Sequence, residues 1–139
     1  MRVAELFSDA NLRYKTPDDI KKAIWKKYIF ISAFATITSY YDKPIGYIYE
    51  HHYEDAKKIL MEIANVAKCN GIDIYDEIDK SLNTAKNLPY KSSTAMQLDY
   101  KNGRKVELES LSGYIVKEAT LHNLKVPLME TFYEKLYSR

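Results

Sequence analysis

The longest apolar run in the sequence is WKKYIFISAFATITSYYDKPIG, from Trp25 to Gly46, and it opens with two lysines. The run is free of charge only from Tyr28 to Tyr41, 14 residues that include four serine or threonine hydroxyls. A helix that crosses a bilayer needs about 20 apolar residues. The run therefore indicates a buried element of a globular core and not a membrane span.

The residues that lead into this run favour a helix over a strand. Isoleucine and threonine are β-branched and suit strands, but Thr16 is a good N-cap and Pro17 is well placed at a first helical position. The spacing predicts one helix from Pro17 to about Tyr41, with a second half that is apolar on all sides, as in the central helix of a bundle. The apolar residues that recur at intervals of 3 and 4 are Ile20, Ala23, Ile24, Tyr28, Ile31, Phe34 and Ala35.

The rest of the sequence predicts further helices joined by short connections, because glycine and proline number only 4 each. Further helices are predicted over 53–68, 74–85, 106–123 and 127–136, with one or two helical turns in KSSTAMQLDYKNG and Gly71 as a C-terminal cap. We expect one all-α domain over residues 1–139, a bundle of about six or seven helices. The inward face of the 106–123 helix is expected to hold Leu108, Leu111, Tyr114, Ile115, Ala119 and Leu121.

Composition argues against several kinds of site. The net charge is +2 and the lysines are mixed with acids, so nucleic acid and anionic membranes are not expected partners. Cys69 is the only cysteine, which excludes an intrachain disulfide and fits a reducing, cytoplasmic compartment. The adjacent His51 and His52 would point about 100° apart on a helix and have no histidine at i+4, so no metal site is expected.

Lys27 and the Ser92–Thr94 cluster each have two interpretations. A lysine at the start of an apolar helix commonly keeps its ammonium group in water. Alternatively, burial at the mouth of the helix makes it a proton donor to a carbonyl oxygen. The hydroxyls of Ser92, Ser93 and Thr94 suit either helix capping or contact with a polar ligand.

Arg104, Glu107 and Glu109 open the predicted 106–123 helix. Acids in a first turn ordinarily complement the helix dipole. The glycines, at 46, 71, 103 and 113, cannot form the G-x-G-x-x-G loop that binds a dinucleotide. The sequence therefore carries no nucleotide-binding fingerprint of its own.

Two segments together resemble a known family. From about Asp19 to Leu136 the order and spacing are similar to the C-terminal domain of the 2-dehydropantoate 2-reductase (ketopantoate reductase) family. The resemblance implies the helical fold shared with the C-terminal domain of 6-phosphogluconate dehydrogenase, and no Rossmann domain in this chain. The residues that carry it are Trp25-x-Lys27, then Met96-x-x-Asp99-x-x-x-Gly103-Arg104-x-x-Glu107-Leu108-Glu109-x-Leu111-x-Gly113-Tyr114, then Val126-Pro127.

The resemblance also implies an activity, the NADPH-dependent reduction of a small 2-keto acid, as in pantothenate biosynthesis. An N-terminal Rossmann domain, missing from this sequence, would bind most of the NADP(H), so the chain alone is expected to be inactive. Lys27 would protonate or polarise the ketone, and Glu107 would lie near the nicotinamide and the substrate. Ser92, Ser93 and Thr94 are the candidate substrate contacts, and a cytoplasmic homodimer is the expected assembly.

The sequence departs from the family pattern at three polar positions. Ile31 and Ala35 stand where the family has asparagines, and Ala95 stands where it has a serine. Because buried polar pairs discriminate strongly between substrates, these changes predict an altered specificity and a divergent paralogue. They also leave open a second hypothesis, a non-catalytic helical dimerisation or interaction module that has lost the reductase chemistry.

Overall fold

The computed structural model describes residues 17–103 and 107–138. Within these ranges the chain forms seven α-helices and one π-helical segment, and no strand. This confirms the predicted all-α fold; Thr16, the expected N-cap, lies outside the described residues. The elements are α2 (Pro17–Tyr41), α3 (Ile45–His51), α4 (Tyr53–Cys69), α5 (Asp76–Asn87), α6 (Ala95–Lys101), η1 (Glu109–Gly113), α7 (Tyr114–Leu121) and α8 (Pro127–Tyr137).

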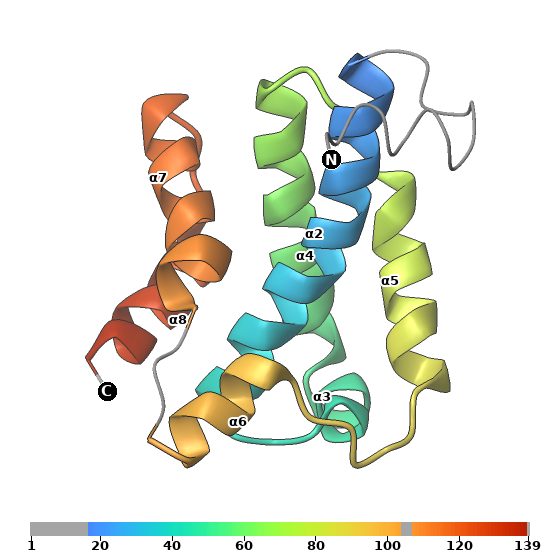
Figure 1. The fold of residues 1–139 in the computed structure, drawn as a ribbon, viewed down its shortest axis with the longest axis vertical. Helices are drawn as coiled ribbons and strands as arrows, with labels where there is room; N and C mark the ends of the chain where they lie inside the picture. Colours follow the sequence, from blue (N-terminus) through green and yellow to red (C-terminus); the bar gives the residue numbers. More distant parts are fainter. Residues whose placement is uncertain (1–16, 104–106, 139) are drawn as a thin grey trace, which may run out of the picture.

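Helix α2 is the centre of the bundle. Figure 1 shows it between α5 on one side and α7 with α8 on the other, with α4 behind it and α6 across its C-terminal half. Every residue from 32 to 39 is buried, because α2 contacts α3, α4, α5, α6, α8 and η1. The apolar run is therefore a core helix, as the sequence predicts.

The predicted boundaries of α2, α4, α5 and α8 agree with the structure to within two residues. Gly71 follows α4 at a φ of +81°, a left-handed conformation that glycine adopts without strain, which confirms its capping role. The stretch Ile45–His51, for which no structure was predicted, is helix α3. The sequence also gave no sign of the π-helical segment η1.

Four residues that the helical spacing placed inward are exposed. Ile24 and Ile31 on α2 are 59% and 44% exposed, and Tyr114 and Leu121 on α7 are 40% and 67% exposed. On α7 the prediction was wrong because a π-helical turn carries an extra residue and shifts the phase of the pattern. On α2 it was wrong because the helix before residue 32 is covered on only part of its circumference.

The carboxylate of Glu62 joins α4 to α8. It is buried and accepts the backbone N–H groups of Leu128 at 3.0 Å and Met129 at 2.8 Å, in the first turn of α8. A carboxylate at a helix N-terminus is also favoured by the helix dipole. Burial raises the pKa of the Glu62 carboxyl, and the two N–H donors oppose this rise.

Glu62→Gln should destabilise the fold, because the amide places an N–H₂ donor against a backbone N–H. We expect the free energy of unfolding to fall by about 2 kcal/mol, measured by urea denaturation. Glu134→Gln, an exposed change on the same helix α8, is the control and should cost less than about 0.5 kcal/mol. Equal and small effects of the two changes would contradict the capping role.

Candidate functional site

Two neighbouring rows of side chains run along α2. Residues four apart lie one above another on a helix. One row is therefore Lys27, Ile31 and Ala35, and the other, one residue further on, is Tyr28, Ser32 and Thr36. The first row begins exposed and ends buried, whereas the second faces the π-helical segment η1.

The hydroxyl row binds the backbone of η1. The Tyr28 hydroxyl lies 2.9 Å from the carbonyl oxygens of both Ser110 and Leu111, and the Ser32 hydroxyl donates to the Leu111 oxygen at 2.5 Å. Backbone hydrogen bonds in a π-helical turn join residues five apart, instead of four as in an α-helix. Buried carbonyl groups need hydrogen-bond partners. Tyr28 and Ser32 of α2 supply such partners, and their hydrogen bonds hold η1 against α2.

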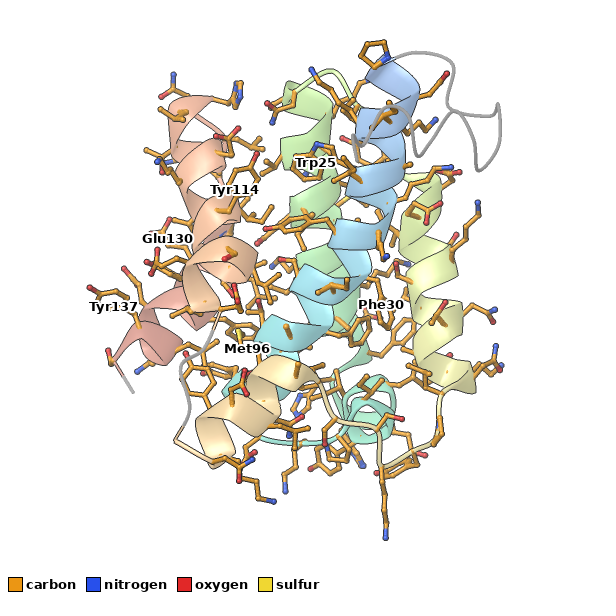
Figure 2. The ribbon with its side chains drawn as sticks, viewed as in Figure 1. Trp25, Phe30, Met96, Tyr114, Glu130 and Tyr137 are labelled. Carbon is orange, nitrogen blue, oxygen red and sulfur yellow. The ribbon has the colours of Figure 1, made fainter. Side chains whose placement is uncertain are left out.

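Further contacts hold the same junction. The hydroxyls of Thr36 and Ser112 are 2.5 Å apart and both buried. The rings of Trp25, Tyr28 and Tyr114 pack at centroid distances of 5.5, 5.9 and 6.2 Å, between α2 and α7 (Figure 2). Burial raises the pKa of the Tyr28 phenol, so the group stays a neutral donor to the η1 carbonyls.

Lys27 and Glu107 lie on either side of the junction of α2 and η1. Lys27 is exposed on α2, directly before Tyr28, whose hydroxyl contacts the Ser110 carbonyl. The Ser110 hydroxyl in turn donates to Glu107 Oε2 at 3.0 Å. The side chains of Lys27 and Glu107 are both exposed. Of the two interpretations of Lys27, the described residues favour the exposed lysine.

The row that contains Lys27 becomes apolar one turn later. Ile31 is 44% exposed, and Ala35 is 3% exposed in a cluster with Met96 and Leu108. Figure 2 labels Met96, where α6 crosses α2. The surface next to Lys27 on this helix is therefore apolar, as the departures from the family pattern led us to expect.

The Ser92–Thr94 cluster anchors α6. The Thr94 hydroxyl accepts the backbone N–H of Gln97 at 3.2 Å, as an N-cap, and lies 2.8 Å from the hydroxyl of Thr38. Thr38 stands eleven residues after Lys27, about 16 Å further along the helix. The structure thus uses Thr94 for capping, and contact between this cluster and a substrate stays a prediction.

The second acid of the motif, Glu109, has a different partner. Its carboxylate accepts the Tyr133 hydroxyl at 2.6 Å, and this hydrogen bond raises the pKa of Tyr133 to about 12. A Cβ atom at Gly113 would lie 2.6 Å from Glu109 Oε1 and 3.0 Å from Tyr133 Cε1. Gly113 therefore leaves room for this pair, which ties η1 to α8.

No three or more of the described His, Cys, Asp and Glu side chains form a group that could hold a metal ion. The His52 ring stacks on Tyr41 and the His51 ring packs against Tyr47. Cys69 is exposed. We also find no helix in the described part of the chain that is long and apolar enough to span a membrane.

The resemblance pointed to Lys27 and Glu107, whose roles stay predictions, but sequence reasoning missed the hydroxyl contacts between α2 and η1. Tyr28, Ser32 and Ser110 were not singled out. The spacing of hydroxyls at 28, 32 and 36 inside an otherwise apolar helix was the available signal, because buried hydroxyls need acceptors. Nothing in the sequence 109–113 indicated that these acceptors belong to a π-helical turn.

The comparisons with known proteins show the family to which the chain belongs. Residues 19–138 match the family described as "Ketopantoate reductase PanE/ApbA C terminal". The chain belongs to this family. It is also 31% identical over 135 residues to the uncharacterized oxidoreductase YkpB of Bacillus subtilis, a match that covers 95% of this chain and 45% of the relative. The chain therefore spans less than half the length of the curated relative that it matches.

Solved structures of ketopantoate reductases show the same fold. The dimeric ketopantoate reductase from Staphylococcus aureus superposes with a TM-score of 0.81 at 23% identity, over 86% of this chain and 43% of that one. The 2-dehydropantoate 2-reductase from Porphyromonas gingivalis gives a TM-score of 0.69 at 29% identity, over 87% and 36% of the two chains. The resemblance that the sequence motifs predict is thereby confirmed.

Removing the hydroxyls that hold η1 should destabilise the domain. Tyr28→Phe removes the side-chain donor to the Ser110 carbonyl and one of the two donors to the Leu111 carbonyl, and Ser32→Ala removes the other. We therefore expect the double change to lower the free energy of unfolding by about 1–2 kcal/mol. Thr120→Ala removes an exposed hydroxyl bonded to the Val116 carbonyl and serves as the control. A cost as small as that of the control, in urea denaturation, would contradict the role of these hydroxyls.

Proposed function

We propose that this chain is the substrate-side domain of an NADPH-dependent reductase that converts a small 2-keto acid to the 2-hydroxy acid. The observation that carries the proposal is that Lys27, next to Tyr28 in the sequence, and Glu107, hydrogen-bonded to Ser110, are both exposed beside the Tyr28–Ser110 contact. The family match over residues 19–138 supports it. A second, N-terminal domain would bind the dinucleotide, and the dimeric enzyme from Staphylococcus aureus supports a homodimer.

The residues of this chain suit the nicotinamide end of NADPH and not its phosphates. The four glycines form no phosphate-binding loop. Glu107 and Lys27 offer a carboxylate and an ammonium group at an exposed edge, where they would face the nicotinamide and the ketone. The phosphates would therefore be held by the other domain. When bound, NADPH supplies the hydride that the carbonyl carbon takes up, and NADP⁺ remains.

Lys27 would complete the reduction by giving a proton to the ketone oxygen. As the carbon takes up the hydride, negative charge develops on that oxygen, and an ammonium group beside it stabilises the charge. The N–H bond of Lys27 breaks and the O–H bond of the hydroxy acid forms, so one hydride and one proton are consumed. Glu107, fixed by Ser110, would orient the reacting groups beside the lysine.

Lys27→Ala should lower kcat by about 10²- to 10⁴-fold, the usual loss for a missing proton donor. The measurement is 2-keto acid-dependent NADPH oxidation by the complete polypeptide that carries this domain together with its dinucleotide-binding domain. Lys26→Ala, at the adjacent and partly buried lysine, is the matched control and should retain kcat within a few-fold. A loss below tenfold for Lys27→Ala would overturn the assignment.

The chain by itself should neither bind NADPH nor oxidise it. Titration of NADPH with the isolated chain, followed by nucleotide fluorescence, should show no saturable signal at micromolar concentrations. The same titration with the complete polypeptide is the control. Saturable micromolar binding to the isolated chain would show that its own residues hold the dinucleotide, contrary to the proposal.

A further inference from the structure

A cavity of about 370 Å³ lies where η1 and α7 face α8. Ligand sites for small organic molecules begin at about this volume. Three residues with large apolar side chains line the cavity: Tyr114, which Figure 2 labels, Val116 and Tyr133. Glu109 and Ser110 contribute polar side chains to the same wall. The cavity thus combines hydrocarbon and aromatic surface with a small number of polar atoms.

Three polar side chains at this cavity have no proton left to offer a ligand. The Tyr133 hydroxyl donates its proton to Glu109 Oε2 at 2.6 Å, and the Ser110 hydroxyl donates its proton to Glu107 Oε2 at 3.0 Å. The carboxylate of Glu109 can only accept hydrogen bonds. The oxygens of these three side chains therefore present lone pairs, and the cavity suits a ligand that donates hydrogen bonds.

The negative charge at this cavity belongs to Glu109. Tyr133 holds the carboxylate in place, and Gly113 leaves it space, because a Cβ atom there would lie 2.6 Å from Glu109 Oε1. Among the residues that the structure describes, no ion pair includes Glu109. Lys117 also lines the cavity, but it stands eight residues after Glu109, about two helical turns away. The charge of Glu109 is therefore available to a ligand.

We propose that this cavity binds a small organic cation, a guanidinium or primary ammonium group on a short hydrocarbon chain. The cation lies against the Glu109 carboxylate and donates hydrogen bonds to the oxygens of Glu109, Tyr133 and Ser110. Hydrogen bonds between charged groups are stronger than neutral ones, and the faces of tyrosine rings attract cations. The hydrocarbon chain packs against Val116. Binding of this ligand requires no turnover and does not depend on the proposed reductase function.

Calorimetric titration of the complete polypeptide, without NADPH or keto acid, tests the inference with three probes. n-Butylguanidinium has both charge and N–H donors, n-butylurea has nearly the same shape without the charge, and tetramethylammonium has the charge without N–H donors. We expect n-butylguanidinium to bind with a dissociation constant of about 1 mM or below, a reasonable affinity for a ligand of this size. The other two probes should bind at least about tenfold more weakly. Equal binding of n-butylguanidinium and either of them would overturn the inference.

Substitutions locate the bound cation. Glu109→Gln removes the charge and keeps an acceptor for Tyr133, so it should weaken binding of n-butylguanidinium at least about tenfold. Glu130→Gln, at an exposed carboxylate of α8 that does not line the cavity, is the matched control and should change the affinity less than about twofold.

Lys117→Met removes a positive charge from the wall of the cavity and should tighten binding by about two- to fivefold. This change affects an exposed side chain, so it tests the site without disturbing the contact between η1 and α8. An affinity that Glu109→Gln leaves unaltered would place the cation elsewhere and overturn the inference. Weaker binding to the Lys117→Met variant would also overturn it, because the ligand would then carry a negative charge that pairs with the lysine.

Discussion

The docking of the π-helical segment η1 onto α2 is the interaction on which the candidate site depends. Tyr28 and Ser32 reach the carbonyls of Ser110 and Leu111 from the central helix. These hydrogen bonds hold η1 against α2. The contact also decides where Glu107 lies, since Ser110 binds its carboxylate.

Different faces of helix α2 contribute to the core and to the candidate site. Residues 32–39 are all buried and hold the bundle together, whereas the part of the helix before them leaves Lys27, Ile24 and Ile31 exposed. The row from Lys27 to Ala35 therefore passes from solvent into the apolar cluster around Met96 and Leu108.

Much of this fold was predictable from local signals in the sequence. The proline at 17, the spacing of apolar residues and Gly71 predicted α2 and α4 with boundaries close to those observed. The π-helical turn was not predictable, because its cause is tertiary: the donors that satisfy it come from residues about 80 positions away. The exposure of Tyr114 and Leu121 follows from that turn and was missed for the same reason.

For the site, the sequence motifs pointed to Lys27 and Glu107 through their resemblance to the family. Physical chemistry alone gave each residue an ordinary interpretation, a solvated lysine and an acid that complements a helix dipole. The role of Thr94 as the cap of α6 became visible only with its partners Thr38 and Gln97 in place. Capping residues and ligand contacts use the same hydroxyl groups, so spacing cannot separate them.

The central claim, that this domain works as one half of a larger reductase, is tested most directly by mass spectrometry, under denaturing conditions, of the protein purified from its source cells. We predict a polypeptide of about twice the 16.2 kDa of this chain, which leaves room for a second domain of ordinary size. A 16.2 kDa chain that purifies without any dinucleotide-binding polypeptide would contradict the account and favour a non-catalytic interaction module.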